Sequence, residues 1–175
     1  MPLTPEGEAQ ARAVARRLAR ENLQEIQTSP RERAQATAQA IAAAAGTPVT
    51  TQDALDEIDF GEWTGRDFSA LDGQPAWDTW NRARSTARAP GGEAMADAAD
   101  RIERHIQSLA ATRGGQSIAF VTHADMIRAL VARVLGLSLD NLLRFEIGPA
   151  SLSLLEAGTW GARVLSLNET TDMAA

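Results

Sequence analysis

His123 is the residue whose position in the sequence most strongly suggests chemistry. It comes after the apolar run 117–121 and directly before a segment with helical periodicity. A helix that begins there presents backbone N–H donors and the positive end of its dipole, both of which suit a phosphate group. The alternative is a buried histidine that only satisfies the hydrogen bond of a neighbour. Position alone leaves both interpretations open.

Arg33 offers the donor geometry that phosphate oxygens need. It falls in the first turn of a helix expected over residues 31–45, just after a strand expected over 23–28. The planar guanidinium group can donate two parallel hydrogen bonds to a phosphoryl group. The competing interpretation is a solvated surface arginine, and it applies more strongly to Arg31.

Glu57 is a candidate general acid in the loop 55–65. A carboxyl group packed against apolar surface can have a raised pKa and can then donate a proton near neutral pH. The same loop contains Asp56, Asp59 and Glu62. A solvated acidic loop is therefore the simpler interpretation, and the local sequence does not single out Glu57.

The second of the two histidines, His105, is predicted to be structural. It lies in the helix expected over 93–112, beside Ile102 and Ile106 at the edge of the apolar face. The chain has no cysteine, so disulfides and thiolate zinc sites are excluded. Two histidines in such different settings do not predict a multi-histidine metal site.

The elements that must position these side chains alternate between helix and strand. Strands are predicted at 23–28, 49–51 and 117–121, and a hairpin from 151–155 and 163–167. The alternation predicts an α/β fold, a three-layer α/β/α sandwich with a mostly parallel sheet and a C-terminal antiparallel hairpin. Ligands of such sheets bind at the carboxyl ends of the strands, where residues 28–30 and 122–123 would lie.

Composition limits the class of protein and its partners. The 175 residues fit one domain, 1–175, and their net charge is −6, which argues against binding nucleic acid or an anionic membrane. No apolar run reaches the ~18 residues of a membrane span, and the N-terminus does not look like a signal peptide. We expect a cytoplasmic protein whose partner is a small phosphorylated metabolite. The oligomeric state is left open, a dimer included.

Five motifs in the right order give the chain a resemblance to a known family, the histidine phosphatase (phosphoglycerate mutase-like) superfamily. Residues 2–11 and 29–38 are similar to P-L-T-x-x-G-x-x-Q-A and S-P-x-x-R-A-x-Q-T-A, the second with alanine at 36. Residues 55–65 and 90–93 resemble L-x-E-x-x-F-G-x-W-E-G, with threonine at 64, and P-G-G-E. Residues 121–128 resemble V-[ST]-H-G-x-x-I-R, with alanine at 124.

The resemblance implies a role for each candidate residue. Arg33 would hold the phosphoryl group, and Glu57 would protonate the leaving oxygen. His123 would stabilise the phosphoryl group during transfer, with the backbone N–H of Ala124 beside it. No metal or other cofactor would be needed, because arginine and histidine supply the positive charge.

One part of the family pattern is missing. The family begins with a central strand that ends in R-H-G, whose histidine becomes phosphohistidine, and the printed sequence contains no R-H-G. We therefore expect an N-terminally truncated version of a longer protein, or a gap filled from elsewhere, and no phosphatase activity from the chain as it stands. The alternatives are a non-catalytic phosphate-binding or interaction module and phosphoglycerate mutase-type phosphoryl transfer.

Overall fold

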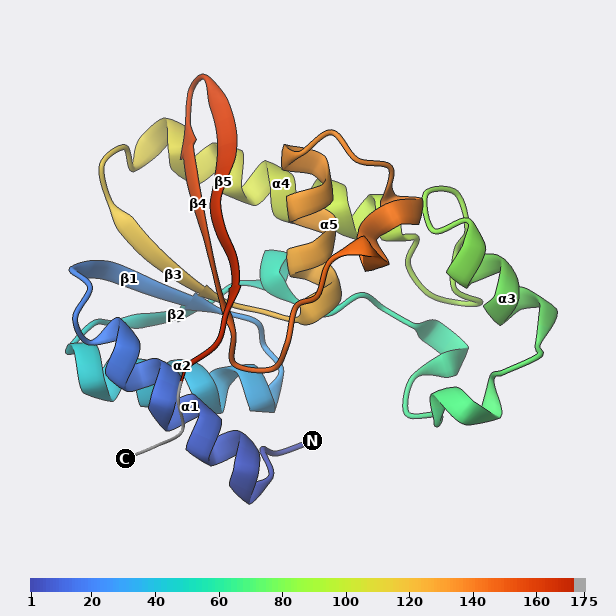
Figure 1. Cartoon of the computed structure of the whole chain (residues 1–175), viewed down its shortest axis with the longest axis horizontal. Helices are drawn as coiled ribbons and strands as arrows, with labels where there is room; N and C mark the ends of the chain where they lie inside the picture. The colour runs from blue at the N-terminus through green and yellow to red at the C-terminus, as the bar shows by residue number, and fades with distance from the viewer. Residues whose placement is uncertain (172–175) are drawn as a thin grey trace.

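A three-stranded parallel sheet lies between two pairs of helices in the computed structural model, which describes residues 1–171 (Figure 1). The central strand is β1 (Leu23–Thr28), which pairs with β2 (Val49–Thr51) on one side and β3 (Ser117–Val121) on the other. The four helices are α1 (Pro5–Leu18), α2 (Glu32–Ala45), α4 (Met95–Thr112) and α5 (Ala124–Val134). In Figure 1 the helices α1 and α2 lie below the sheet, and α4 and α5 lie above it.

The helix ends follow from local sequence. Thr4 precedes α1, and its hydroxyl accepts a hydrogen bond of 3.1 Å from the N–H of Gly7. Pro5 occupies the first turn, where its missing N–H has no partner to lose. Gly46 ends α2 with a φ of 68°, a left-handed conformation that favours glycine. Both ends were predicted from the sequence and are confirmed.

The two faces of the sheet bury different side chains. Ile26 is fully buried among α1 and α2, where Ala119 and Val121 also pack. Phe120 points to the opposite face and packs against the core formed by α4 and α5. This alternation, with one face to each helix layer, produces the three-layer arrangement that the sequence predicted.

The last two strands form a separate sheet. β4 (Leu152–Gly158) and β5 (Gly161–Glu169) pair antiparallel and contact α4 and α5, and in Figure 1 they run across the direction of the main strands. Within residues 1–171, β3 has no strand partner on the edge away from β1. The apolar residues of β3 are consequently only half-buried, although their continuous run predicts a strand covered on both faces.

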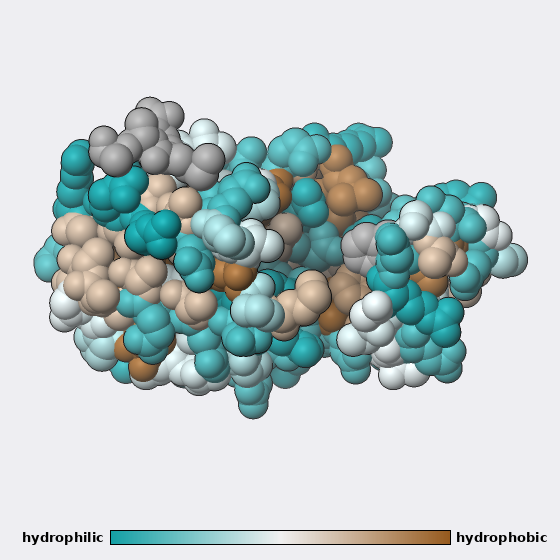
Figure 2. All heavy atoms as spheres, turned by 90° about the horizontal axis from the view of Figure 1, so that it is seen from below, coloured by the Kyte–Doolittle hydropathy of each residue, from teal (hydrophilic) through white to brown (hydrophobic). Residues whose placement is uncertain are grey.

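Residues 61–92 form a lobe on the right in Figures 1 and 2, and their buried side chains belong to the same core as those of α4 and α5. Trp63, Trp77 and Trp80 hold it together, with Trp63 edge-to-face against Trp77 at 5.2 Å and against Trp80 at 6.0 Å. A further 3₁₀ segment, η4 (Leu139–Arg144), follows α5. No helix of the described chain is both long and apolar enough to cross a membrane. η1 (Asp53–Leu55) precedes the lobe and contacts α4, and the segments of the lobe are η2 (Gly61–Trp63), η3 (Phe68–Ala70) and α3 (Pro75–Arg82).

At two glycines the backbone of the loop that carries Glu57 lies very close to the backbone of residues 90–93. A Cβ atom at Gly61, whose φ is 53°, would lie 2.2 Å from the carbonyl oxygen of Pro90. A Cβ atom at Gly92 would lie 2.3 Å from the carbonyl oxygen of Asp59. Only glycine permits this approach of two backbones.

We expect Gly61→Ala to lower the free energy of unfolding by about 3 kcal/mol, because it adds a backbone clash to the strain of a left-handed alanine. Gly136→Ala is the matched control, since its φ is 67° and the space around it is open. The control should cost only about 1 kcal/mol. Denaturant unfolding of both variants measures the difference. Equal losses in the free energy of unfolding would show that the close approach at Gly61 does not contribute to stability.

Candidate functional site

Three side chains selected from the sequence meet at one place. Arg33 Nη2 lies 2.9 Å from Nδ1 of His123 and 3.3 Å from Oε2 of Glu57. The same carboxyl oxygen is 3.5 Å from Nδ1 of His123. Residues that are far apart in the sequence therefore surround one small volume.

The parallel pairing of β1 and β3 brings them together. Thr28 and Val121 are register partners at the carboxyl ends of these strands, and the N–H of Ser29 bonds to the carbonyl oxygen of Val121 at 2.9 Å. α2, which carries Arg33, starts just after β1, and His123 is the N-cap of α5 just after β3. The placement at the carboxyl end of a parallel sheet is the one that the sequence predicts.

The loop with Glu57 is attached to the same edge. The hydroxyl of Thr122 donates a hydrogen bond of 2.7 Å to the carbonyl oxygen of Leu55. The N–H of Glu57 bonds at 2.7 Å to Oδ1 of Asp56, which also accepts from Nε of Arg31 at 2.7 Å. Of the acids in this loop, the structure places Glu57 against Arg33 and His123.

Ala124 is the first residue of α5. The first backbone hydrogen bond of that helix runs from the N–H of Ile127 to the carbonyl oxygen of His123. The N–H of Ala124 therefore precedes the hydrogen-bonded part of the helix. Such N–H groups at a helix start have no intrahelical acceptor. They can donate to an anion placed beside His123.

Burial shifts the pKa values of His123 and Glu57 in opposite directions. Burial, followed by the charge of Arg33, lowers the pKa of His123 to about 4. Burial, followed by the charge of Asp125, raises the pKa of Glu57 to about 7. At neutral pH the histidine is therefore uncharged and much of Glu57 carries a proton, as a general acid requires.

These shifts predict opposite pH effects on stability. The folded-state pKa of Glu57 lies above its ordinary 4.5, so its contribution to stability decreases as pH rises from 4.5 to about 7. The folded-state pKa of His123 lies below its ordinary 6.5, so its contribution increases as pH rises from about 4 to 6.5. Between pH 4.5 and 6.5 the two slopes oppose each other and largely cancel.

Replacing either Glu57 or His123 should leave the pH dependence of stability that the other residue contributes. We expect the free energy of unfolding of Glu57→Gln, relative to wild type, to rise with pH across that window by up to about 1.4 kcal/mol per unit. The free energy of unfolding of His123→Asn, relative to wild type, should fall with pH across the same window. Glu62→Gln, a change to an exposed carboxylate in the same loop, should keep the wild-type profile. Urea unfolding at several pH values measures all four proteins, and parallel profiles would contradict the shifts.

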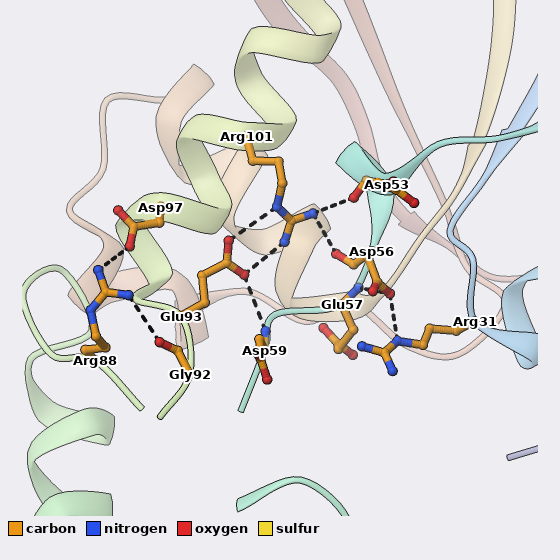
Figure 3. A pocket seen from close by; sticks show the side chains of 10 residues that line it. All are labelled: Arg31, Asp53, Asp56, Glu57, Asp59, Arg88, Gly92, Glu93, Asp97 and Arg101. Carbon is orange, nitrogen blue, oxygen red and sulfur yellow. Dashed lines mark hydrogen bonds and ion pairs between the residues drawn. The ribbon is translucent and has the colours of Figure 1, made fainter. Parts of the chain in front are cut away.

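A pocket of about 600 Å³ opens beside Glu57 (Figure 3). Its three arginines are each paired with a carboxylate, and three more carboxylates remain, so its wall is net negative. Neither Arg33 nor His123 lines it. The wall of this pocket is therefore unsuited to a phosphoryl group. The lining residues are Arg31, Asp53, Asp56, Glu57, Asp59, Arg88, Gly92, Glu93, Asp97 and Arg101.

Sequence reasoning missed several residues that support the site. Ser29 lies behind His123, with Oγ 2.8 Å from Nε2. Asp125 is bracketed by Arg84 and Arg128, at 3.4 and 3.0 Å. The sequence placed Ser29 at the end of a predicted strand but did not predict its contact with His123, and no local signal marks Asp125.

His105 stays outside the site. Its Nε2 lies 2.6 Å from Oε1 of Gln27, on the sheet face that α4 covers. Within residues 1–171, no group of three His, Cys, Asp or Glu side chains is placed to hold a metal ion. The structural role predicted for His105 agrees with this position.

Comparison with known proteins gives matches over nearly the whole chain. The family described as "Histidine phosphatase superfamily (branch 1)" matches residues 1–170. "Phosphoserine phosphatase 1" of Hydrogenobacter thermophilus is 29% identical over 170 residues, 96% of this chain and 81% of the relative. "Probable phosphoglycerate mutase GpmB" of Serratia proteamaculans is 31% identical over 159 residues, 89% of this chain and 73% of the relative.

Solved structures agree in fold. YhfR of Bacillus stearothermophilus has a TM-score of 0.91 at 25% identity, covering 99% of this chain and 87% of the other. A mycobacterial glucosyl-3-phosphoglycerate phosphatase has a TM-score of 0.84 at 25% identity, covering 97% and 87%.

Proposed function

Since the chain belongs to the histidine phosphatase superfamily, branch 1, we propose that Arg33, Glu57 and His123 bind the phosphoryl group of a small phosphomonoester. The observation that carries the proposal is the meeting of a guanidinium, a carboxyl group with a pKa of about 7 and an uncharged imidazole at a helix start. Each group suits a different part of a phosphomonoester.

The roles follow from the contacts. Arg33 turns its guanidinium from Nδ1 of His123 to two phosphoryl oxygens. Nδ1 of His123 is then free to take up the proton of a monoanionic phosphoryl group and to hold it in a hydrogen bond to a third oxygen, beside the N–H of Ala124. Glu57, protonated for much of the time at neutral pH, gives its proton to the leaving oxygen. Positive charge comes from the side chains, so the proposal needs no metal.

Family chemistry also needs a histidine that attacks phosphorus. The printed sequence has two histidines. His123 occupies the position of the second histidine of the family pattern, and His105 is bonded to Gln27 on another face of the sheet. We propose that the 175 residues bind a phosphomonoester without hydrolysing it, and that an added histidine nucleophile makes the site a phosphatase.

Two measurements on the chain test this. Titration calorimetry with inorganic phosphate should give binding that His123→Ala weakens, while p-nitrophenyl phosphate should not be hydrolysed. A version extended at its N-terminus by a strand ending in Arg-His-Gly should hydrolyse that substrate. Turnover by the chain itself, abolished in His123→Ala, would overturn the proposed inactivity. Absence of phosphate binding would overturn the proposed site.

The substrate class is inferred from the relatives. The names of two of them refer to phosphoserine and phosphoglycerate, so we propose a small phosphorylated metabolite rather than a nucleic acid or a membrane. Mutase-type transfer is the second candidate, because one of these relatives is named as a phosphoglycerate mutase. The extended version, given 3-phosphoglycerate, would release phosphate as a phosphatase and form 2-phosphoglycerate as a mutase.

A further inference from the structure

A chain of hydrogen bonds runs from His123 away from the proposed phosphoryl position. Nε2 of His123 lies 2.8 Å from Oγ of Ser29, and this Oγ lies 3.2 Å from Oδ1 of Asp56. Ser29 is completely buried and His123 is only 5% exposed. Solvent therefore has no part in holding this side of the imidazole.

Donor and acceptor chemistry fixes the direction of each bond. A guanidinium nitrogen has no lone pair, so Arg33 Nη2 must donate to Nδ1 of His123. The proton of the uncharged imidazole is then on Nε2, which donates to Ser29. The N–H of Arg31 also donates to Ser29, at 3.2 Å. The hydroxyl has thereby filled both acceptor positions, and its own proton goes to Asp56.

Asp56 is held as an acceptor. Its Oδ1 also accepts from Nε of Arg31 and from the N–H of Glu57, both at 2.7 Å. Burial alone would raise the pKa of Asp56, but the hydrogen bond from Arg31 and that from Glu57 leave it below the ordinary value. A carboxylate cannot donate, so it forces the hydroxyl of Ser29 to point toward Asp56.

We propose that Ser29 and Asp56 are positioning residues that keep His123 in the tautomer with its proton on Nε2. Resting on the proposed function, this means that Nδ1 is the nitrogen that can take up a proton and donate it to a phosphoryl oxygen after Arg33 has turned away. Ser29 itself is not a nucleophile, because it is buried and both lone pairs of its oxygen are engaged.

The test removes Arg33, so that Ser29 and Asp56 act on the imidazole without it. Nitrogen-15 NMR of labelled histidine side chains distinguishes the two tautomers at neutral pH, without ligand. In Arg33→Ala we expect at least about a tenfold excess of the Nε2 tautomer. Adding Ser29→Ala or Asp56→Asn should reduce that excess roughly tenfold, because Nε2–H then loses its acceptor or the hydroxyl can reverse.

Ser85→Ala in the Arg33→Ala background is the matched control. Ser85 makes the same kind of bond, 2.8 Å to Oδ2 of Asp140, on an exposed loop. It should leave the His123 tautomer unchanged. In every variant the unchanged signal of His105 reports an intact fold, and two separate variants guard against one that does not fold.

The outcomes separate this inference from the proposed function. No tautomer preference in Arg33→Ala, or a preference that both Ser29→Ala and Asp56→Asn leave intact, overturns the positioning role. A preference that responds as expected supports it, even if inorganic phosphate does not bind. Failure of phosphate to bind the wild-type chain overturns only the proposed function.

Discussion

Arg33→Ala is expected to weaken the binding of inorganic phosphate by about a hundredfold. Loss of one partner from a hydrogen-bonded charge pair costs roughly 3 kcal/mol, and the planar fork makes two bonds at once. The Arg33 side chain is 40% exposed, and its contacts to Glu57 and His123 leave the guanidinium group free to turn toward a ligand. Titration calorimetry of the variant and the wild type measures the change directly.

The identity of the side chain matters as well as its charge. Arg33→Lys keeps the charge but lacks the fork, so it should recover only part of the affinity. Arg163→Ala is the control, since Arg163 pairs with Glu156 on the distant hairpin. A dissociation constant that stays within about threefold of the wild type in Arg33→Ala would contradict the assignment.

A second measurement on Arg33→Ala reports the site without any ligand. Arg33 is a cause of the low pKa of His123 and opposes the rise in the pKa of Glu57. Its removal should therefore raise both pKa values, and NMR titration of His123 follows the first of them. An unchanged pKa for His123 would mean that the guanidinium lies elsewhere in solution.

Family and layer order could be predicted from the sequence because they depend on local patterns. Alternating strands and helices predicted the parallel sheet, and motifs such as 29–38 and 121–128 predicted the family that the comparisons confirm. The hairpin was predicted at 151–155 and 163–167, but it extends to β4 and β5, with only two residues in the turn. Leu154 and Leu165 are more than half exposed, so apolar periodicity could not define these strands.

What could not be predicted depends on distances between elements. Nothing in the sequence 55–65 distinguishes Glu57 from its acidic neighbours, because the difference is its distance from Arg33 and His123. The half-buried state of β3 likewise depends on which strand lies beside it. Burial then sets the pKa of Glu57 and of His123, so their chemistry follows from the assembled fold.

Arg101 shows how a residue outside the motifs can support the site. Its Nη1 donates to three carbonyl oxygens of the loop before Glu57, at 3.0, 3.0 and 3.1 Å, and Nη2 bonds to Glu93 at 3.0 Å (Figure 3). We expect Arg101→Met to lower the free energy of unfolding by about 3–5 kcal/mol, because the change leaves the carboxylate of Glu93 and three carbonyl groups without their donor. Denaturant unfolding measures the loss.

Arg104→Met is the matched control, one helical turn along α4 at an exposed position. Among residues 1–171 its guanidinium bonds only to the carbonyl oxygen of Asp100, so the change should stay within about 0.5 kcal/mol. Adding Glu93→Met to Arg101→Met should restore part of the stability, because it removes the unpaired carboxylate. A loss below about 1 kcal/mol in Arg101→Met would mean that the loop holds its shape unaided. If the larger loss is found, the position of Glu57 depends on an arginine that no phosphate contacts.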